Sequence, residues 1–265
     1  MSFKQFAGRS RKLMANDPYA RFKNLTFKSF QEMAADPSLT RYEKIGFPNT
    51  YREGKETDIF RDIEQKLTNL ATRGATVLDI GPGCSDLPRM MIDLCCRQGH
   101  QLILVDSAEM LQHLPDSPAI TKITGRFPHD CAGLFENYGG RIDAILSYSV
   151  LHYIFAEGSV FDFVDRSLGL LADGGEFLIG DIPNISKRKR FFSSAAGIRY
   201  HQAFTGSQET PAVAFNRLDS GEIDDSVLLS LMIRARTAGY DAYILPQASS
   251  LPMANRREDI LIRKP

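Results

Sequence analysis

The chain of 265 residues has little of what marks membrane, secreted or nucleic-acid-binding proteins. It contains no apolar run near the roughly 18 to 20 residues of a membrane span, and its first residues lack the apolar core of a signal peptide. Its four cysteines form no C-x-x-C pair, so we expect reduced thiols in a cytoplasmic protein. Its net charge is zero, which argues against binding to nucleic acid or to an anionic membrane through a global field. With 43% hydrophobic and 24% charged residues, it has the composition of a globular chain with one large domain.

One stretch of the sequence carries the pattern that decides the fold. The apolar residues of 77–80 break into a turn that contains Gly81 and Gly83, a helix-like segment follows, and a second apolar run ends in Asp106. This order of strand, turn, helix and strand opens a nucleotide-binding α/β sheet. The glycines allow a sharp turn and a close approach of the backbone to a ligand. Asp106, at the tip of the second strand, can accept both hydroxyls of a ribose, so we predict a nucleoside-bearing cofactor.

The glycine pattern separates two classes of cofactor. In the dinucleotide fingerprint G-x-G-x-x-G, the place of the third glycine is taken here by Asp86. Its carboxylate would lie near a pyrophosphate with nothing nearby to neutralise it. The residues Asp79, Gly81, Gly83 and Ser85 fit D-x-G-x-G-x-[G/S] instead. This arrangement resembles motif I of class I S-adenosylmethionine-dependent methyltransferases. Their cofactor, S-adenosyl-L-methionine (SAM), has an adenosine, no phosphate and a zwitterionic methionine.

The resemblance extends from about Glu56 to Pro265 and implies the architecture. It implies a Rossmann-like α/β fold: a seven-stranded, mostly parallel sheet with helices on both faces and strand seven antiparallel between strands five and six. Residues 142–154 fit the strand-four region of the family. We expect 1–55 to form an N-terminal helical cap, 56–265 to form the methyltransferase domain, and 184–225 to be an insertion that covers the acceptor site.

Hydrophobic periodicity gives the expected elements within that frame. The expected helices are 56–70, 85–95, 108–114, 160–171 and 226–238. The expected strands are 76–80, 102–106, 120–124, 143–147, 176–180, 242–245 and 259–262.

The resemblance also implies a set of cofactor-binding residues. They are Asp79, Gly81, Gly83, Cys84, Asp106, Ser107, Phe127, Ser147, Tyr148 and Arg52. Asp106 would bind the ribose and Ser107 would flank the adenine, while Phe127 would stack on the adenine or pack in the core. Arg52 would hold the methionine carboxylate or form a surface salt bridge. For Asp79 and Asp106 the alternative role is to cap the helix that follows each of them.

Two residues are candidates for catalysis. Methyl transfer is an in-line displacement in which the protein mainly positions the acceptor, although a hydroxyl acceptor also needs a base, a metal or a strong hydrogen-bond acceptor. His152, just past strand four, would be a general base or a histidine packed beneath the cofactor. Asp181, at the tip of strand five, would orient His152, hold the acceptor, bind a metal or cap a loop. Strand four offers Ser147 where a metal site would want another acidic ligand, so we expect no metal.

The acceptor is less well defined by the sequence. Strand four has Ser147–Val150 in place of the N/D-P-P-Y/F motif of enzymes that methylate bases, so with the neutral charge we expect a small-molecule acceptor and no nucleic acid. The run Lys187–Arg190 would clamp an anionic acceptor or form a solvated helix face. Tyr200, His201, Phe204 and Glu209 would line an acceptor pocket or form a buried lid.

A further similarity concerns the segments 51–55, 151–153 and 181–187. They are similar to segments of bacterial enzymes associated with surface-polysaccharide assembly, which implies a hydroxyl of a sugar or sugar nucleotide as acceptor. Two other functions stay open: a non-catalytic protein that binds SAM, and a nicotinamide-dependent oxidoreductase, because Asp106 would serve a ribose in either case.

Overall fold

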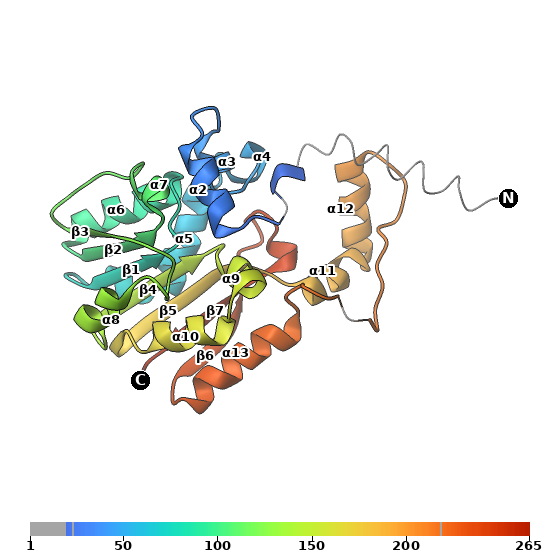
Figure 1. The fold of residues 1–265 in the computed structure, drawn as a ribbon. Helices are drawn as coiled ribbons and strands as arrows, with labels where there is room; N and C mark the ends of the chain where they lie inside the picture. The colour runs from blue at the N-terminus through green and yellow to red at the C-terminus, as the bar shows by residue number, and fades with distance from the viewer. Residues whose placement is uncertain (1–19, 23, 218) are drawn as a thin grey trace.

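One mixed sheet organises the molecule in the computed structural model, which describes residues 20–22, 24–217 and 219–265 (Figure 1). Its strand order is β3-β2-β1-β4-β5-β7-β6. The strands are β1 (Thr76–Ile80), β2 (Gln101–Asp106), β3 (Ile120–Thr124), β4 (Ile142–Tyr148), β5 (Leu171–Pro183), β6 (Asp241–Pro246) and β7 (Arg257–Arg263). Strand β7 runs antiparallel to both of its neighbours, and the remaining pairs are parallel. The predicted fold class is confirmed.

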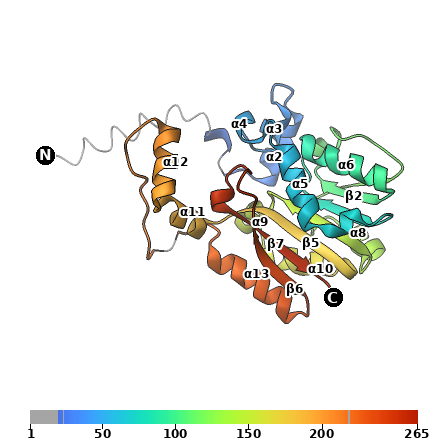
Figure 2. The ribbon, with the colours of Figure 1, turned by 180° about the vertical axis from the view of Figure 1, so that it is seen from behind.

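Helices cover both faces of this sheet (Figures 1 and 2). The elements on one face are α5 (Glu56–Lys66), η3 (Thr68–Ala71), α6 (Asp86–Gln98) and α7 (Ala108–Leu111); those on the other are α8 (Ala132–Tyr138), α9 (Leu151–Glu157), α10 (Val160–Leu168) and α13 (Asp225–Thr237). Successive strand residues point to opposite faces, so Val77 packs in one hydrophobic cluster and Leu78 in the other. The two clusters make this a three-layer core.

Two further groups of helices lie beyond the layers. The first comprises η2 (Ala20–Phe22), α2 (Phe27–Ala35), α3 (Arg41–Lys44) and α4 (Asn49–Arg52), and the second comprises α11 (Ile185–Phe192), α12 (Ala195–Thr205) and η4 (Ala254–Arg256). Helix α2 packs against α7, and Figure 1 shows α2 to α4 above the sheet. Figures 1 and 2 both show α12 reaching away from the sheet. Within the described residues, no helix is long and apolar enough to cross a membrane.

The element boundaries differ from the expected ones in a few places. Helix α7 ends at Leu111 instead of residue 114, and β5 starts five residues before the expected strand. Helix α9 begins directly after β4, so its apolar residues read as a continuation of the strand. Helix α8 has no wide apolar stripe, since Leu134 is its one buried residue.

Candidate binding site

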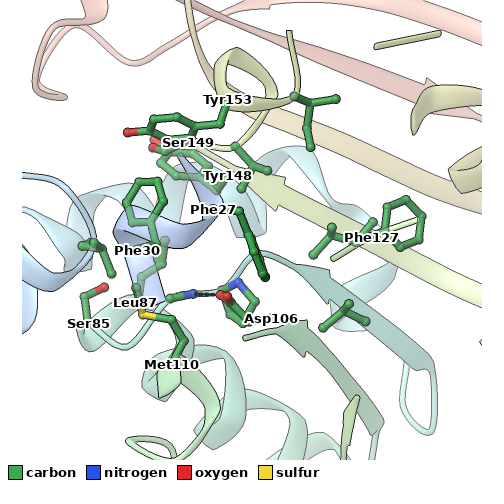
Figure 3. A pocket seen from close by; sticks show the side chains of 18 of the residues that line it. Phe27, Phe30, Ser85, Leu87, Asp106, Met110, Phe127, Tyr148, Ser149 and Tyr153 are labelled. Atoms are coloured by element: carbon green, nitrogen blue, oxygen red, sulfur yellow. Dashed lines mark hydrogen bonds between the residues drawn. The ribbon is translucent and has the colours of Figure 1, made fainter. Parts of the chain in front are cut away.

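A mostly apolar pocket lies at the carboxyl ends of β1, β2 and β4, beneath α2 and α3 (Figure 3). Strand order reverses between β1 and β4, which is where open α/β sheets bind their ligands. Figure 3 shows Tyr148, Ser149 and Tyr153 on one side of the pocket, Asp106 on the opposite side, and Phe27 and Phe30 between them. The polar groups are few and stand at separate points of an apolar wall, as in sites that fix the orientation of a small ligand.

The turn after β1 forms the floor of this pocket. Gly81 and Gly83 have φ angles of +71° and +67°, a region that side chains with a Cβ rarely adopt. A Cβ at Gly83 would lie 2.5 Å from Cγ2 of Ile45, and one at Gly81 would lie 2.7 Å from Cγ2 of Val150. The glycines therefore let the turn pack against the end of α3 at Gly83 and the start of α9 at Gly81, as well as approach the pocket.

Asp106 joins this turn to the second strand. Its Oδ2 accepts a hydrogen bond of 2.9 Å from the Gly83 N–H, and its Oδ1 accepts one of 2.7 Å from the Ser107 N–H. Burial raises the pKa of Asp106 to about 6, and burial together with the Asp106 charge raises the pKa of Asp79 to about 8. Asp106 lines the pocket, whereas Asp79 is buried behind it and is outside the lining.

Arg52 brings a buried positive charge to the pocket. Its Nη2 donates to Oγ of Ser149 at 2.6 Å and to Oδ2 of Asp181 at 3.3 Å. The guanidinium lies 4.3 Å from the centre of the Phe47 ring and 5.5 Å from that of Tyr148. Only 4% of Arg52 is exposed, so the alternative prediction of a salt bridge at the surface is wrong, and its ion pair with Asp181 is buried.

Glu56 brings a buried negative charge to the same pocket and was not among the predicted site residues. Its Oε2 accepts a 2.7 Å hydrogen bond from the Leu87 N–H, at the start of α6. Its Oε1 is buried and has no hydrogen-bond partner among the described residues. Burial raises the pKa of this carboxyl, and the nearby Arg52 acts in the opposite direction. The sequence gives only a weak signal that Glu56 lines a pocket, because it is simply the first residue of the amphipathic helix α5.

The two predicted catalytic residues stand behind the pocket wall rather than in its lining. Ser149, with φ of +61°, donates its hydroxyl to Asp181 and separates that carboxylate from the cavity. Burial alone would raise the pKa of Asp181, but Arg257 and Arg52 lower it. Burial and then Arg257 lower the pKa of His152 to about 3, and its Nδ1 is buried with no hydrogen-bond partner in the described chain.

Comparison with known proteins supports the fold and no closer relationship. No family model matches the chain, and no curated protein matches it in sequence. The solved structure of the CurJ carbon methyltransferase is similar with a TM-score of 0.54 and 16% identity, over 97% of this chain and 70% of that one. The plantazolicin methyltransferase BpumL, crystallised with a desmethylPZN analogue and SAH, gives a TM-score of 0.52 and 13% identity, over 90% of this chain and 97% of that one. A SAM-dependent methyltransferase from Aquifex aeolicus gives a TM-score of 0.50 and 11% identity, over 87% of this chain and 99% of that one.

The chain has the fold of SAM-dependent methyltransferases. At these identities the likeness concerns the fold, so any activity has to be argued from this chain's own residues. The other residues that were predicted to bind the cofactor occupy varied places around this pocket.

Phe127 and Tyr148 line the pocket, and three other predicted residues are buried outside its lining. Phe127 also packs against Phe163, with ring centres 5.5 Å apart, so it serves the core as well. Ser107 accepts a hydrogen bond from the Met110 N–H and caps α7. Ser147 and Cys84 are both buried, and burial raises the pKa of the Cys84 thiol to about 11.

The carboxylate of Asp86 has two partners on α3. The expectation that nothing neutralises this carboxylate is wrong, because it pairs with Arg41 and accepts a 2.8 Å hydrogen bond from the Tyr42 hydroxyl. Both partners belong to α3, so Asp86 ties the N-terminal helices to α6.

The basic run after β5 is largely paired within the protein. Lys189 pairs with Asp219 and Arg190 pairs with Asp225, while Lys187 donates to the Arg257 carbonyl at 2.7 Å. These contacts favour the helix-face alternative over an anion clamp. In the described part of the chain, no group of three or more His, Cys, Asp or Glu side chains is placed to hold a metal ion.

Proposed function

We propose that this chain is a SAM-dependent methyltransferase and that the pocket holds SAM. The observation that carries the proposal is that Arg52 and Glu56, buried charges of opposite sign, line one cavity together with Asp106. An α-amino acid carries a carboxylate and an ammonium on one carbon, and these two side chains offer a partner for each. Asp106 would accept the ribose hydroxyls, so the pocket would receive both ends of SAM.

The same charges argue against a dinucleotide. A pyrophosphate needs N–H groups or cations, whereas this lining carries the carboxylates of Asp106, Glu56 and Glu157. A second cation of the lining, Arg126, is paired with Glu157. A nicotinamide-dependent oxidoreductase would therefore place two negative phosphates among unfavourable neighbours.

We infer that the acceptor is a small molecule, with a sugar or sugar-nucleotide hydroxyl as the leading candidate. The neutral charge of the chain supports a compact acceptor, and so does the position of α2 to α4 above the sheet, with side chains in the pocket lining. We retain His152 as the candidate base, a role that requires the acceptor to reach past the pocket wall to this ring. Asp181 would act through Ser149 and Arg52 as a positioning residue. We retain residues 1–55 as the cap, of which 1–19 and 23 lie outside the described residues. We also retain 184–225 as the insertion and the cytoplasm as the location.

The experiment that tests this proposal is methyl transfer from labelled SAM to a panel of sugars and sugar nucleotides. Transfer to a small molecule, with release of S-adenosylhomocysteine (SAH), supports an enzyme. Binding of SAM without transfer to any acceptor favours a non-catalytic SAM-binding protein. Failure to bind SAM contradicts both.

A further inference from the structure

A second cleft lies beside the proposed cofactor pocket, bounded by α4, α12 and the segment between β6 and β7. Tyr51 lines this cleft, while the next residue, Arg52, lines the cofactor pocket. Gln247 also lines the cleft, and its Nε2 donates to the Tyr148 hydroxyl at 3.4 Å. Because Tyr148 lines the cofactor pocket, the two cavities adjoin at this contact.

The cleft contains two buried acceptor atoms that need donors. Oε1 of Gln247 and Oδ1 of Asn255 are buried, and neither has a hydrogen-bond partner among the described residues. Gln247 is 7% exposed, and its amide nitrogen already serves Asp259 at 3.1 Å. A buried carbonyl oxygen without a donor is costly, so a ligand with hydroxyl or amine donors would satisfy these atoms.

The cleft also presents positive charge without a carboxylate to balance it. Lys55 and Arg256 line it, and neither forms an ion pair within the part of the chain that the structure describes. Burial lowers the pKa of Arg256, which is the direction expected for a cation that lacks a close anion. Guanidinium groups bind phosphate and carboxylate through paired hydrogen bonds.

One wall of the cleft is aromatic and open to solvent. The rings of Tyr200 and Phe204 on α12 are stacked at 5°, with centres 6.3 Å apart, and are 41% and 65% exposed. Exposed aromatic side chains at a cleft rimmed by polar residues mark a contact surface for a ligand.

We propose that this cleft binds the acceptor, a small anionic molecule that carries hydroxyl or amine donors and a ring. This inference rests on the proposed methyltransferase function and adds the place and chemical class of the acceptor. Arg256 and Lys55 bind the anionic group, Gln247 and Asn255 accept hydrogen bonds from the donors, and the α12 rings pack on the ring.

The test is calorimetric titration of the full chain, saturated with SAH, with UDP-glucose and with glucose as the neutral match. UDP-glucose binds and glucose does not. Arg256→Met and Lys55→Met each weaken UDP-glucose binding by about tenfold or more, because each removes a charge-assisted contact. Phe204→Ala, at an exposed ring whose loss does not threaten folding, weakens it several-fold.

Lys28→Met is the matched control, since Lys28 is an exposed cation on α2 whose ion pair is with Glu32 of the same helix. It leaves UDP-glucose binding unchanged, and SAH affinity stays within about twofold in all four variants. Absence of UDP-glucose binding, or binding that none of the three cleft variants weakens, overturns the acceptor site. Failure of SAH to bind in the first step instead contradicts the proposed function.

Discussion

At the scale of single residues, the ribose assignment depends on Asp106. Asp106→Asn keeps the shape of the side chain and removes the charged acceptor, so SAH affinity falls by about 1.5 to 3 kcal/mol. The pKa of Asp106 is raised to about 6, and the ionised form is the one that accepts both hydroxyls. Affinity therefore drops as the pH falls below about 6 in the unaltered protein, and this drop disappears in the variant. Calorimetry at several pH values measures both effects, and an unchanged affinity in the variant would refute the assignment.

Glu56 gives a separate test of the amino-acid end. Glu56→Gln keeps the hydrogen bond from Leu87 within reach and removes the charge that would face the ammonium group. SAH binding weakens about tenfold or more, while 5′-methylthioadenosine, which lacks the amino acid, binds both proteins equally. Equal losses for the two ligands would mean that the substitution damages the pocket as a whole and that Glu56 does not recognise the ammonium.

His152 is the residue on which a base mechanism depends. Its pKa of about 3 keeps the ring neutral from pH 5 upwards. One of its two ring nitrogens is therefore without a proton throughout the usual assay range. His152→Ala should cut turnover by about 10²-fold with SAH affinity nearly unchanged. A folded variant that turns over at a near-normal rate assigns His152 to packing against Tyr153.

At the scale of elements, the contact between α3 and α6 holds the cover of the pocket in place. Asp86→Ala removes the ion pair with Arg41 and the hydrogen bond from Tyr42, contacts worth about 1 kcal/mol together at this partly exposed site. We expect faster proteolysis within residues 27–52 and weaker SAH binding. Asp58→Ala, which breaks an exposed pair with Arg61 inside α5, is the control. Equal proteolysis of both variants would show that Asp86 does not secure these helices.

Elements with a strong local pattern could be predicted from sequence. The strands Thr76–Ile80 and Ile120–Thr124 have the predicted bounds. Helix α9 could not be separated from β4, since apolar residues continue in the sequence across the boundary. The end of that strand is set by Ser149, whose left-handed backbone turns the chain, and hydrophobic periodicity carries no signal for that turn.

At the scale of the whole molecule, site residues that lie close together in the sequence could be predicted, and those from distant segments could not. Gly81, Gly83 and Asp106 line the pocket as predicted because one strand-turn-helix-strand unit brings them together. Phe30 and Glu56 reach it through packing of separate segments, which periodicity cannot show. Asp181 stands behind the wall because Ser149 lies between its carboxylate and the cavity. His152 also lies outside the pocket lining.

The central claim is that the pocket binds SAM rather than a dinucleotide, and calorimetric titration with SAM, SAH and NAD in parallel tests it most directly. The buried Arg52 and Glu56 predict micromolar binding of SAM and SAH and no binding of NAD. Binding of NAD alone would contradict the account and make Asp106 the ribose ligand of a dehydrogenase.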